Sequence, residues 1–490
     1  MAEIVVIGSG FAGLSAATAL ADAGHIVTVL EKNETPGGRA RSFSAEGFTF
    51  DMGPSWYWMP DVFEDYFRQH GYQPSDFYEL KRLDPSYRVV FSPNFLLDIP
   101  ASMPHLEALF EQIEAGAGNA LREFLAQAKY KYEVGMHNLV HQPGRSLGEY
   151  MDVQLLKDVL RLDVFKSLSQ HVRKFFKHPK LLKLVEFPVL FLGATPQDTP
   201  ALYSLMNYAD MSLGTWYPMG GMHKIVEAMV AVARKKGVKF IFNAEVTQLD
   251  VSQRQVKNIK TRQGSYAAQV VVAGADYHHV EQKLLVKEQR SYTEGYWKGR
   301  TMAPSSLLFY LGIDRKIPNL LHHNLFFDRD FELHAKEIYK KPSWPADPLF
   351  YACVPSITDD SVAPEGMENL FLLIPVAPGL EDTEEIREKY FQQLMDRLQV
   401  QTGVDIRKHI VYKRSYAHRN FMEDYHAFKG NAYGLANTLM QTAYLKPKLK
   451  SKKVDNLYFT GQLTVPGPGV PPSLISGNVV AKEIIKDLAS

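Results

Sequence analysis

The stretch Glu3-Ile4-Val5-Val6-Ile7-Gly8-Ser9-Gly10-Phe11-Ala12-Gly13 decides the fold of this chain. It joins a short apolar strand to a glycine-rich turn, and residues 14–23 continue as a helix of small residues. In a dinucleotide-binding βαβ unit the first glycine allows the tight turn, the second admits the pyrophosphate, and the third lets the helix pack on the sheet. Gly8, Gly10 and Gly13 occupy these places, and the helix N-terminus presents free N–H groups to phosphate. The stretch therefore predicts nucleotide binding.

A second strand and a second glycine turn narrow the nucleotide to FAD. Residues 25–30 form the strand, and Glu31 follows where the motif places an acid for the ribose hydroxyls. An acid at this place disfavours a 2′-phosphate, so we do not expect NADP. Gly37-Gly38-Arg39-Ala40 then supplies a turn whose planar, always-charged arginine can lie along a pyrophosphate. Two-dinucleotide-fold flavoproteins need this element and NAD-dependent dehydrogenases do not; the alternative is a surface turn with a solvated arginine.

Length and composition limit the remaining classes of protein. A chain of 490 residues is expected to hold roughly two or three domains. Its 55 basic and 54 acidic residues nearly balance, so the net charge gives no reason to expect nucleic-acid binding. The one cysteine, Cys353, cannot form an intramolecular disulfide and suits a reducing compartment, so we expect a cytoplasmic protein.

Two long uncharged stretches resemble membrane segments in hydropathy, but their glycines and prolines indicate other structures. Residues 4–21 contain the glycines of the turn and lack a basic segment before them, so they are not a signal peptide. Residues 461–481 contain several prolines, which a regular spanning helix does not tolerate. We therefore expect no transmembrane helix.

The order of the segments predicts an α/β protein with a discontinuous FAD domain. Residues 1–95, 214–295 and 415–490 carry strand-and-glycine patterns and are expected to form a Rossmann-like FAD-binding domain. Residues 96–213 are expected to be the helical part of a substrate domain that can face a membrane, and residues 296–414 its mixed α/β part. The predicted fold class is a two-dinucleotide-binding-domain flavoprotein with an inserted α+β substrate domain.

Further motifs along the chain give it a resemblance to a known family. They are residues 51–60, 190–196, 214–222, 272–276, 322–327, 355–359 and 459–472. Together with the N-terminal fingerprint they resemble bacterial-type phytoene desaturases, in the carotenoid-desaturase branch of the amine-oxidase-like FAD superfamily. The resemblance spans nearly the whole chain. It departs from many members at Val465, where they have histidine, and at Pro468, where they have glycine or alanine.

The resemblance implies a reaction and leaves alternatives open. It implies that an FAD enzyme removes a hydride and a proton from adjacent carbons of a linear polyene, first of all phytoene on the way to lycopene. A hydroxylated carotenoid desaturated at its 3,4 bond and a C30 diapocarotenoid are the alternatives within the family. A flavin oxidase of amine or porphyrinogen type, and a lipid-carrying protein of the same fold, are more distant alternatives. A quinone or oxygen is the implied electron acceptor, and the oligomeric state stays open.

The residues that we expect to bind FAD come from both glycine turns, the end of the second strand, residues 51–60, the strand ends near residues 246 and 275, and the C-terminal motif. They are Gly8, Gly10, Phe11, Ala12, Gly13, Glu31, Lys32, Gly38, Arg39, Gly53, Pro54, Ser55, Val246, Ala275, Gly461, Gln462, Gly469 and Val470. Side chains that can line a channel for the polyene are Trp56, Trp58, Tyr203, Trp216 and His322, and core packing is the alternative for each. No side chain stands out as a catalytic base.

Histidine pairs and basic stretches raise the questions of a metal and of a membrane surface. We expect no metal site at His278-His279 or His322-His323, because adjacent residues on a strand point to opposite faces. Residues 173–184 mix basic and large apolar side chains and can lie on a membrane surface; a helix packed on its own core is the alternative. Residues 446–453 hold five lysines and are expected to be a solvated loop, with anionic-lipid contact as the alternative. We expect reversible peripheral membrane association.

Overall fold

A parallel sheet carries the glycine turn that follows the first strand. The computed structural model describes residues 1–146, 149 and 166–489. The sheet runs in the order β19 (Leu457–Phe459), β13 (Val270–Ala273), β1 (Glu3–Ile7), β2 (Ile26–Leu30) and β9 (Lys239–Ile241), and all neighbours are parallel. Four of the five residues of β1 are buried, as expected for a central strand covered on both faces. The glycine turn therefore leaves from the middle of the sheet.

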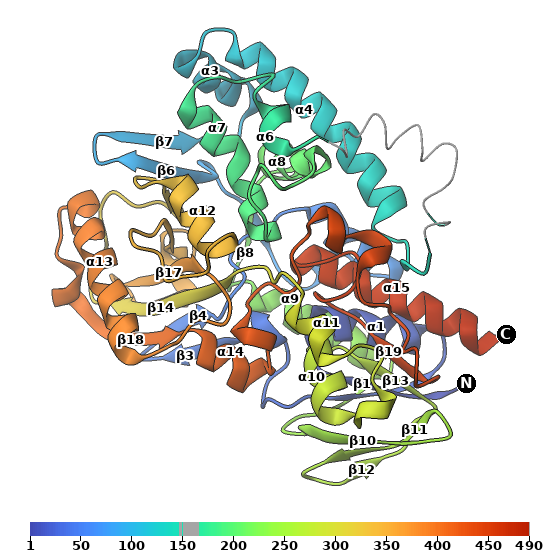
Figure 1. Ribbon diagram of the computed structural model, residues 1–490. Helices are drawn as coiled ribbons and strands as arrows, with labels where there is room; N and C mark the ends of the chain where they lie inside the picture. Colours follow the sequence, from blue (N-terminus) through green and yellow to red (C-terminus); the bar gives the residue numbers. More distant parts are fainter. Residues whose placement is uncertain (147–148, 150–165, 490) are drawn as a thin grey trace.

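Helix α1 (Phe11–Asp22) begins at this turn and packs closely between its neighbours. Ten of its 12 residues are buried, and most of them are small, so other helices can approach it closely. The C-terminal helix α15 (Val470–Ala489) lies against α1, where the Ser15 hydroxyl donates to the Leu474 carbonyl oxygen at 2.8 Å. Helix α9 (His223–Lys235) also packs on α1, and both chain termini lie in this part of the molecule (Figure 1).

A second, seven-stranded sheet forms the other side of the molecule. Its order is β18 (Ile410–Tyr416), β14 (Ser305–Ile313), β17 (Glu368–Val376), β16 (Phe350–Cys353), β15 (His323–Phe326), β6 (Tyr87–Ser92) and β7 (Phe95–Ile99). Neighbouring strands are antiparallel except for β15 and β6, which are parallel. All nine residues of β14 are buried, and alternate side chains enter two different cores. Leu307 and Phe309 pack under helix α13 (Glu384–Thr402), whereas Leu308 points to the inner face.

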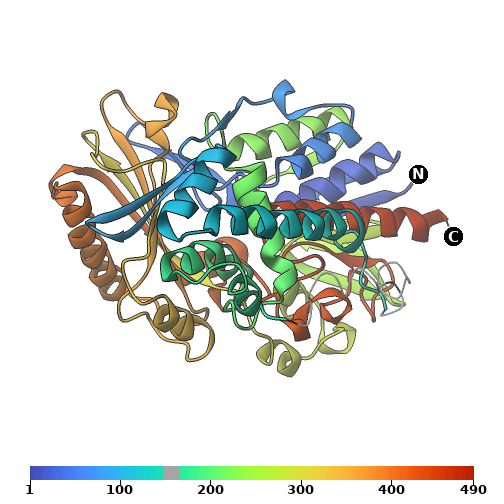
Figure 2. The ribbon, with the colours of Figure 1, turned by 90° about the horizontal axis from the view of Figure 1, so that it is seen from above.

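Helices cover the top of both sheets. They include α3 (Met103–Ile113), α4 (Ala117–Val134), α6 (Leu168–Val172) and α7 (Pro179–Glu186). Figure 2 shows the molecule from above, with α4 running across its middle. Part of the predicted helical region, residues 147–148 and 150–165, lies outside the described residues. Along the part of the chain that is described, no helix is both long and apolar enough to cross a membrane.

Shorter elements connect these parts. They are β3 (Ser42–Ala45), β4 (Phe48–Asp51), α2 (Pro60–Gln69), β5 (Leu80–Arg82), α8 (Leu205–Asn207), β8 (Trp216–Pro218), β10 (Val246–Ser252), β11 (Gln255–Thr261), β12 (Ser265–Tyr266), α10 (Tyr277–His279), α11 (Glu294–Lys298), α12 (Phe331–Tyr339) and α14 (His418–Tyr425). The carboxylate of Asp51, at the end of β4, accepts the backbone N–H groups of Met222 and His223 at 2.7 and 3.0 Å. The Asp51 carboxylate thereby satisfies backbone N–H groups that have no partner within helix α9.

The fold confirms the predicted mixed α/β class, with a parallel sheet built from more than one chain segment. The five parallel strands come from the three segments that we assigned to the FAD domain. Strand β6, which lies in the first of these segments, pairs with β15 of the second sheet instead. Strand β18 spans the predicted boundary after residue 414. The domain boundaries themselves stay a prediction.

Candidate functional site

A cavity of about 400 Å³ lies between the glycine turns of the parallel sheet and the inner face of the second sheet. Every residue that the sequence predicts to bind FAD lines this cavity, except Gly13. The lining side chains and backbone come from segments more than 400 residues apart, such as Gly8 and Gly469. The fold thus collects the predicted residues around one space.

The two glycine turns form a backbone cradle at one end of the cavity. A Cβ on Gly13 would lie 2.1 Å from the Gly8 carbonyl oxygen, so only glycine allows α1 to start this close to β1. A Cβ on Gly10 would meet nothing within 4 Å, because this residue faces open space. Gly38, in the second turn, lies against Gly10, where a Cβ on it would be 3.2 Å from the Gly10 Cα. The cradle leaves room beside backbone N–H groups, which fits the diphosphate of FAD.

Glu31 is held in place by hydrogen bonds from the turn beside it. Its Oε2 accepts the backbone N–H and the hydroxyl of Ser9 at 2.8 and 2.6 Å. Its Oε1 accepts the backbone N–H and side-chain amide of Asn33 at 2.8 and 3.0 Å. The carboxylate is buried and fixed at the cavity wall, where the motif places the partner of the ribose hydroxyls. Ser9 and Asn33 were not predicted as site residues, although both are close neighbours of the motif.

Arg39 supplies a cation beside the cradle. Its guanidinium lies 5.2 Å from the centre of the Tyr425 ring, and its Nη2 donates to the Asn431 carbonyl oxygen at 3.2 Å. Its Nε is buried and has no hydrogen-bond partner among the described residues. Burial raises the pKa of nearby Asp276 to about 6, against the opposing effect of Arg39. A half-buried arginine that lines the cavity and has an unused donor on Nε fits the role of a pyrophosphate contact.

The nucleotide end of the cavity also contains side chains that the sequence did not indicate. His279 and His426 stack with ring centroids 3.9 Å apart, beside the predicted Lys32 and Val246. Burial lowers the pKa of His279 to about 3, so this imidazole is neutral. The two histidines come from α10 and from the end of α14, and no sequence motif connects them.

The opposite wall of the cavity is mainly apolar. The predicted channel residues Trp56 and Trp58 line it, together with Pro188, Met206, Leu308, Tyr351 and Leu373. The predicted residues Tyr203, Trp216 and His322 do not line it. Trp216 instead packs under the guanidinium of Arg82, and its indole N–H donates to the Leu213 carbonyl oxygen at 2.9 Å. The strand contributions from β14, β16 and β17 could not be recognised from the sequence, because they depend on the pairing of distant strands.

A buried carboxyl group supports this wall from behind. The Trp58 indole N–H donates to the Thr215 hydroxyl at 2.9 Å, and the Tyr87 hydroxyl donates to Asp210 at 2.7 Å. Thr215 also contacts Asp210, at 3.5 Å. Burial raises the pKa of Asp210 to about 7. The network fixes the orientation of Trp58, and Tyr87 in turn packs against Trp56 with ring centroids 5.3 Å apart.

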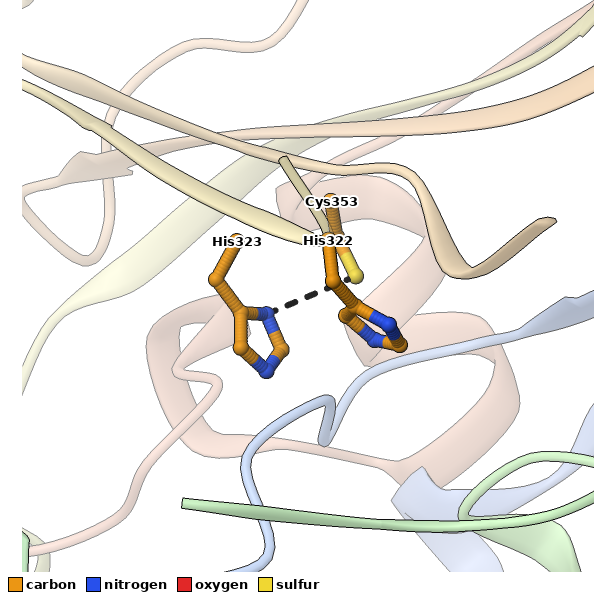
Figure 3. A group of neighbouring side chains, drawn as sticks. All are labelled: His322, His323 and Cys353. Atoms are coloured by element: carbon orange, nitrogen blue, oxygen red, sulfur yellow. Dashed lines mark hydrogen bonds between the residues drawn. The ribbon is translucent and has the colours of Figure 1, made fainter. Parts of the chain in front are cut away.

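His322, His323 and Cys353 lie side by side near this wall (Figure 3). The expectation that the two histidines point to opposite faces is wrong, because His322 precedes β15 in a bend and the ring centroids are 4.4 Å apart. Their Nδ1 atoms are hydrogen-bonded, to the hydroxyl groups of Thr358 at 2.8 Å and Tyr351 at 2.6 Å, whereas their Nε2 atoms have no hydrogen-bond partner among the described residues.

The arrangement of this cluster differs from that of a formed metal site. The potential ligand atoms lie within 4.8 Å of one another, and tetrahedral zinc holds its ligands roughly 3.5 Å apart. Burial also raises the pKa of Cys353 to about 12, which keeps its sulfur a thiol. The absence of a metal site stays a prediction. It now rests on the spacing of the ligand atoms and on the protonated thiol, and no longer on adjacent strand residues pointing to opposite faces.

The cradle, the fixed acid and Arg39 fit FAD, and the family match shows an FAD-dependent oxidoreductase. The family described as flavin containing amine oxidoreductase matches residues 11–485. The chain is 43% identical over 489 residues to a carotenoid 3,4-desaturase of Haloarcula japonica, covering 99% of both chains. It is 31% identical to a zeta-carotene-forming phytoene desaturase of Myxococcus xanthus, over 99% of this chain and 94% of that one. The chain belongs to the carotenoid desaturases of the flavin containing amine oxidoreductase family.

Two further similarities complete the comparison. The chain is 30% identical to a 4,4'-diapophytoene desaturase of Staphylococcus aureus over 499 residues. The alignment covers 99% of both chains. Among solved structures, a putrescine oxidase variant superposes with a TM-score of 0.62 at 13% identity, over 99% of both chains. At this identity the structural likeness establishes the fold alone.

Replacing Gly10 tests the cradle without disturbing the fold. A valine at this position has space and an allowed extended backbone, with φ −71° and ψ 174°, but fills the place of the diphosphate. We expect Gly10→Val to be purified without flavin, with the apoprotein unfolding at the same temperature as wild-type apoprotein. Gly13→Ala is the contrasting variant, because its Cβ meets the Gly8 oxygen and should lower the unfolding temperature as well. Yellow Gly10→Val protein would contradict the cofactor assignment.

The raised pKa of Asp210 predicts a pH dependence of stability. The folded chain holds this proton up to about pH 7, whereas an unfolded aspartate releases it near 3.8. Stability should therefore fall as the pH rises from about 4 to about 7, by roughly 1.4 kcal/mol for each unit of pKa difference. Asp210→Asn should remove this contribution to the slope in thermal unfolding measured across that range. An identical slope in both proteins would show that Asp210 is not the group concerned.

Proposed function

We propose that this enzyme desaturates the C3–C4 bond of a linear, hydroxylated carotenoid. The observation that carries this proposal is the 43% identity to a carotenoid 3,4-desaturase, well above the 31% and 30% to the phytoene and diapophytoene desaturases. From the sequence alone, phytoene is the first expectation and a hydroxylated carotenoid is an alternative substrate. We now place the hydroxylated carotenoid first.

The character of the cavity supports a polyene substrate. Trp56, Trp58, Leu308 and Leu373 give it an apolar wall opposite the glycine cradle. A polyene that leaves a bilayer or micelle for this wall exchanges one apolar environment for another and excludes water from the reacting bond. No charged side chain stands on this wall among the lining residues, so an amine substrate would lack a counter-ion there. The wall therefore favours a polyene over the amine substrate of an amine oxidase.

The chemistry divides between the cofactor and the chain. When bound, FAD supplies the acceptor for a hydride. The residues of the apolar wall orient the polyene and keep water away, while the substrate loses a proton from the neighbouring carbon as the new double bond forms. No described side chain is assigned as the base. We expect a quinone or oxygen to reoxidise the enzyme.

Phytoene and its C30 counterpart form the second candidate class of substrate. Two relatives that act on such hydrocarbons align with 99% of this chain. The apolar wall accepts a hydrocarbon as well as a hydroxylated chain.

Co-expression in a bacterium without carotenoids tests the substrate. One strain would supply phytoene, a second diapophytoene, and a third a hydroxylated C40 carotenoid saturated at C3–C4. We expect a longer chromophore in the lipid extract of the third strain alone, seen as a red shift in the visible spectrum. The Gly10→Val variant serves as the flavin-free control. Coloured product from phytoene with no change in the third strain would overturn the proposed substrate.

We also propose that the enzyme binds reversibly to a membrane surface, from which an insoluble polyene must be taken. Within residues 173–184, Phe176, Leu181 and Leu184 are buried in the core, as expected for a helix packed on its own protein. Several basic side chains of this segment point outward instead and can contact anionic headgroups.

The second basic stretch, residues 446–453, is not the solvated loop that we expected. Lys446 is buried, the Lys448 amine donates to the carbonyl oxygens of Gly144 and Tyr444 at 2.6 and 2.7 Å, and Lys450 pairs with Asp487 at 2.7 Å. These lysines are used within the fold, so we place the membrane contact on residues 173–184.

Charge reversal tests this contact. The triple variant Lys174→Glu, Lys177→Glu and Lys183→Glu should lose most of its co-sedimentation with anionic liposomes at low salt, at about 1 kcal/mol per lysine. Reversal of three exposed lysines elsewhere, Lys257, Lys287 and Lys298, is the matched control and should leave binding nearly unchanged. Equal loss in both triple variants would indicate a general charge effect, and no binding by wild-type protein would end the proposal.

A further inference from the structure

A chain of three polar side chains interrupts the apolar wall of the cavity. The Tyr351 hydroxyl donates to the Ser55 hydroxyl oxygen at 3.0 Å, and His323 Nδ1 lies 2.6 Å from the Tyr351 oxygen. Ser55 and Tyr351 line the cavity, whereas His323 is fully buried behind them and stacks on Trp56 with ring centroids 4.2 Å apart. The chain therefore connects the core of the second sheet with the cavity.

The hydrogen bonds have one consistent direction. Tyr351 has a single hydroxyl hydrogen and directs it to Ser55, so the short contact with His323 requires an N–H on Nδ1. Burial holds the pKa of His323 well below its usual value, so the ring is neutral and carries one hydrogen. His323 thus donates to Tyr351, with Cys353 Sγ as a longer contact of the same Nδ1 at 3.7 Å, and Tyr351 donates to Ser55.

The chain ends in an unused donor at the cavity. Within the described part of the protein, no acceptor is paired with the hydroxyl hydrogen of Ser55. Two donors in series polarise this hydroxyl and strengthen it as a donor. When an apolar occupant displaces water, a donor without an acceptor destabilises the complex. The site therefore favours an occupant that presents an oxygen atom near Ser55.

We infer that Ser55 hydrogen-bonds the hydroxyl oxygen of the polyene and so selects the hydroxylated substrate. Tyr351 and His323 act as positioning residues for Ser55. A hydrocarbon chain can slide along an apolar wall, because every register offers similar contacts. One hydrogen bond fixes the register, and with it the bond that reacts. This inference rests on the proposed function and adds the group that recognises the hydroxyl.

A carbonyl oxygen of the flavin ring offers the same acceptor chemistry. The positions of Tyr351 on β16 and His323 on β15 favour the substrate, because both strands belong to the second sheet and not to the cradle. Tyr351 pairs across β16 and β17 with Leu373, which also lines the apolar wall. The donor chain thus reaches the cavity from the side that we assign to the polyene.

Equilibrium binding to the purified, FAD-loaded enzyme tests the inference. The probes are two C40 polyenes that differ by one terminal hydroxyl, and the flavin is kept reduced so that no turnover occurs. We expect wild-type protein to bind the hydroxylated probe more tightly. Ser55→Ala should remove this advantage, about 10- to 100-fold, by weakening the binding of the hydroxylated probe and by strengthening that of the hydrocarbon, which no longer faces an unpaired donor.

Two tyrosine variants distinguish the positioning of Ser55 by Tyr351 from the effect of losing any buried tyrosine hydroxyl. Tyr351→Phe should reduce the advantage of the hydroxylated probe in the same direction as Ser55→Ala. Tyr310→Phe is the matched control: its hydroxyl is also buried in the second sheet but donates to the Met52 carbonyl oxygen at 2.6 Å and not to Ser55. We expect it to keep the advantage.

Equal affinity of wild-type protein for both probes, or an unchanged advantage in Ser55→Ala, would overturn the inference. A shift of the flavin spectrum or reduction potential in Ser55→Ala, with the hydroxyl advantage intact, would also overturn it and assign Ser55 to the flavin. Failure of the proposed function has a different signature. In that case the Ser55-dependent preference would be present in binding, but the C3–C4 bond would stay saturated in the co-expression strains.

Discussion

The contact between Gly13 and the Gly8 carbonyl oxygen is the constraint on which the rest of the structure depends. A side chain at Gly13 would overlap that oxygen, so strand β1 and helix α1 meet at this distance only through glycine. The contact brings the first turn of α1 to the cavity, where Gly10 leaves its backbone open. The strands beside β1 and the helices beside α1 then close around the cradle. Cofactor binding and core packing therefore depend on the same few backbone positions.

The cavity combines two surfaces with different physical requirements. The cradle presents backbone donors, a fixed carboxylate and the guanidinium of Arg39, as a charged dinucleotide needs. The wall from the second sheet presents aliphatic and aromatic side chains, as a polyene needs. Residues 51–60 connect the two, since Gly53 and Pro54 are followed directly by Trp56 and Trp58. One segment thus places the apolar wall beside the expected position of the flavin.

The residues that line the cradle could be named from the sequence because their signals are local. Glycine spacing, a following acid and a second glycine turn each reflect contacts between residues close in the chain. The wall was predicted less completely, because Leu308, Tyr351 and Leu373 meet only through the pairing of strands far apart in sequence. The error on the two histidines has a related cause: His322 lies outside the strand that includes His323, and only the structure shows where the strand begins.

Local constraints also explain why this fold supports different substrates. A putrescine oxidase variant shares the fold at 13% identity, so most side chains can change while the backbone is kept. The cradle tolerates little change, because it is made of close backbone contacts. The wall tolerates more, because an apolar surface can be built from many side chains. Substrate choice should therefore depend on the few polar atoms of the wall. In this chain the hydroxyl of Ser55, supported by Tyr351 and His323, is such a group.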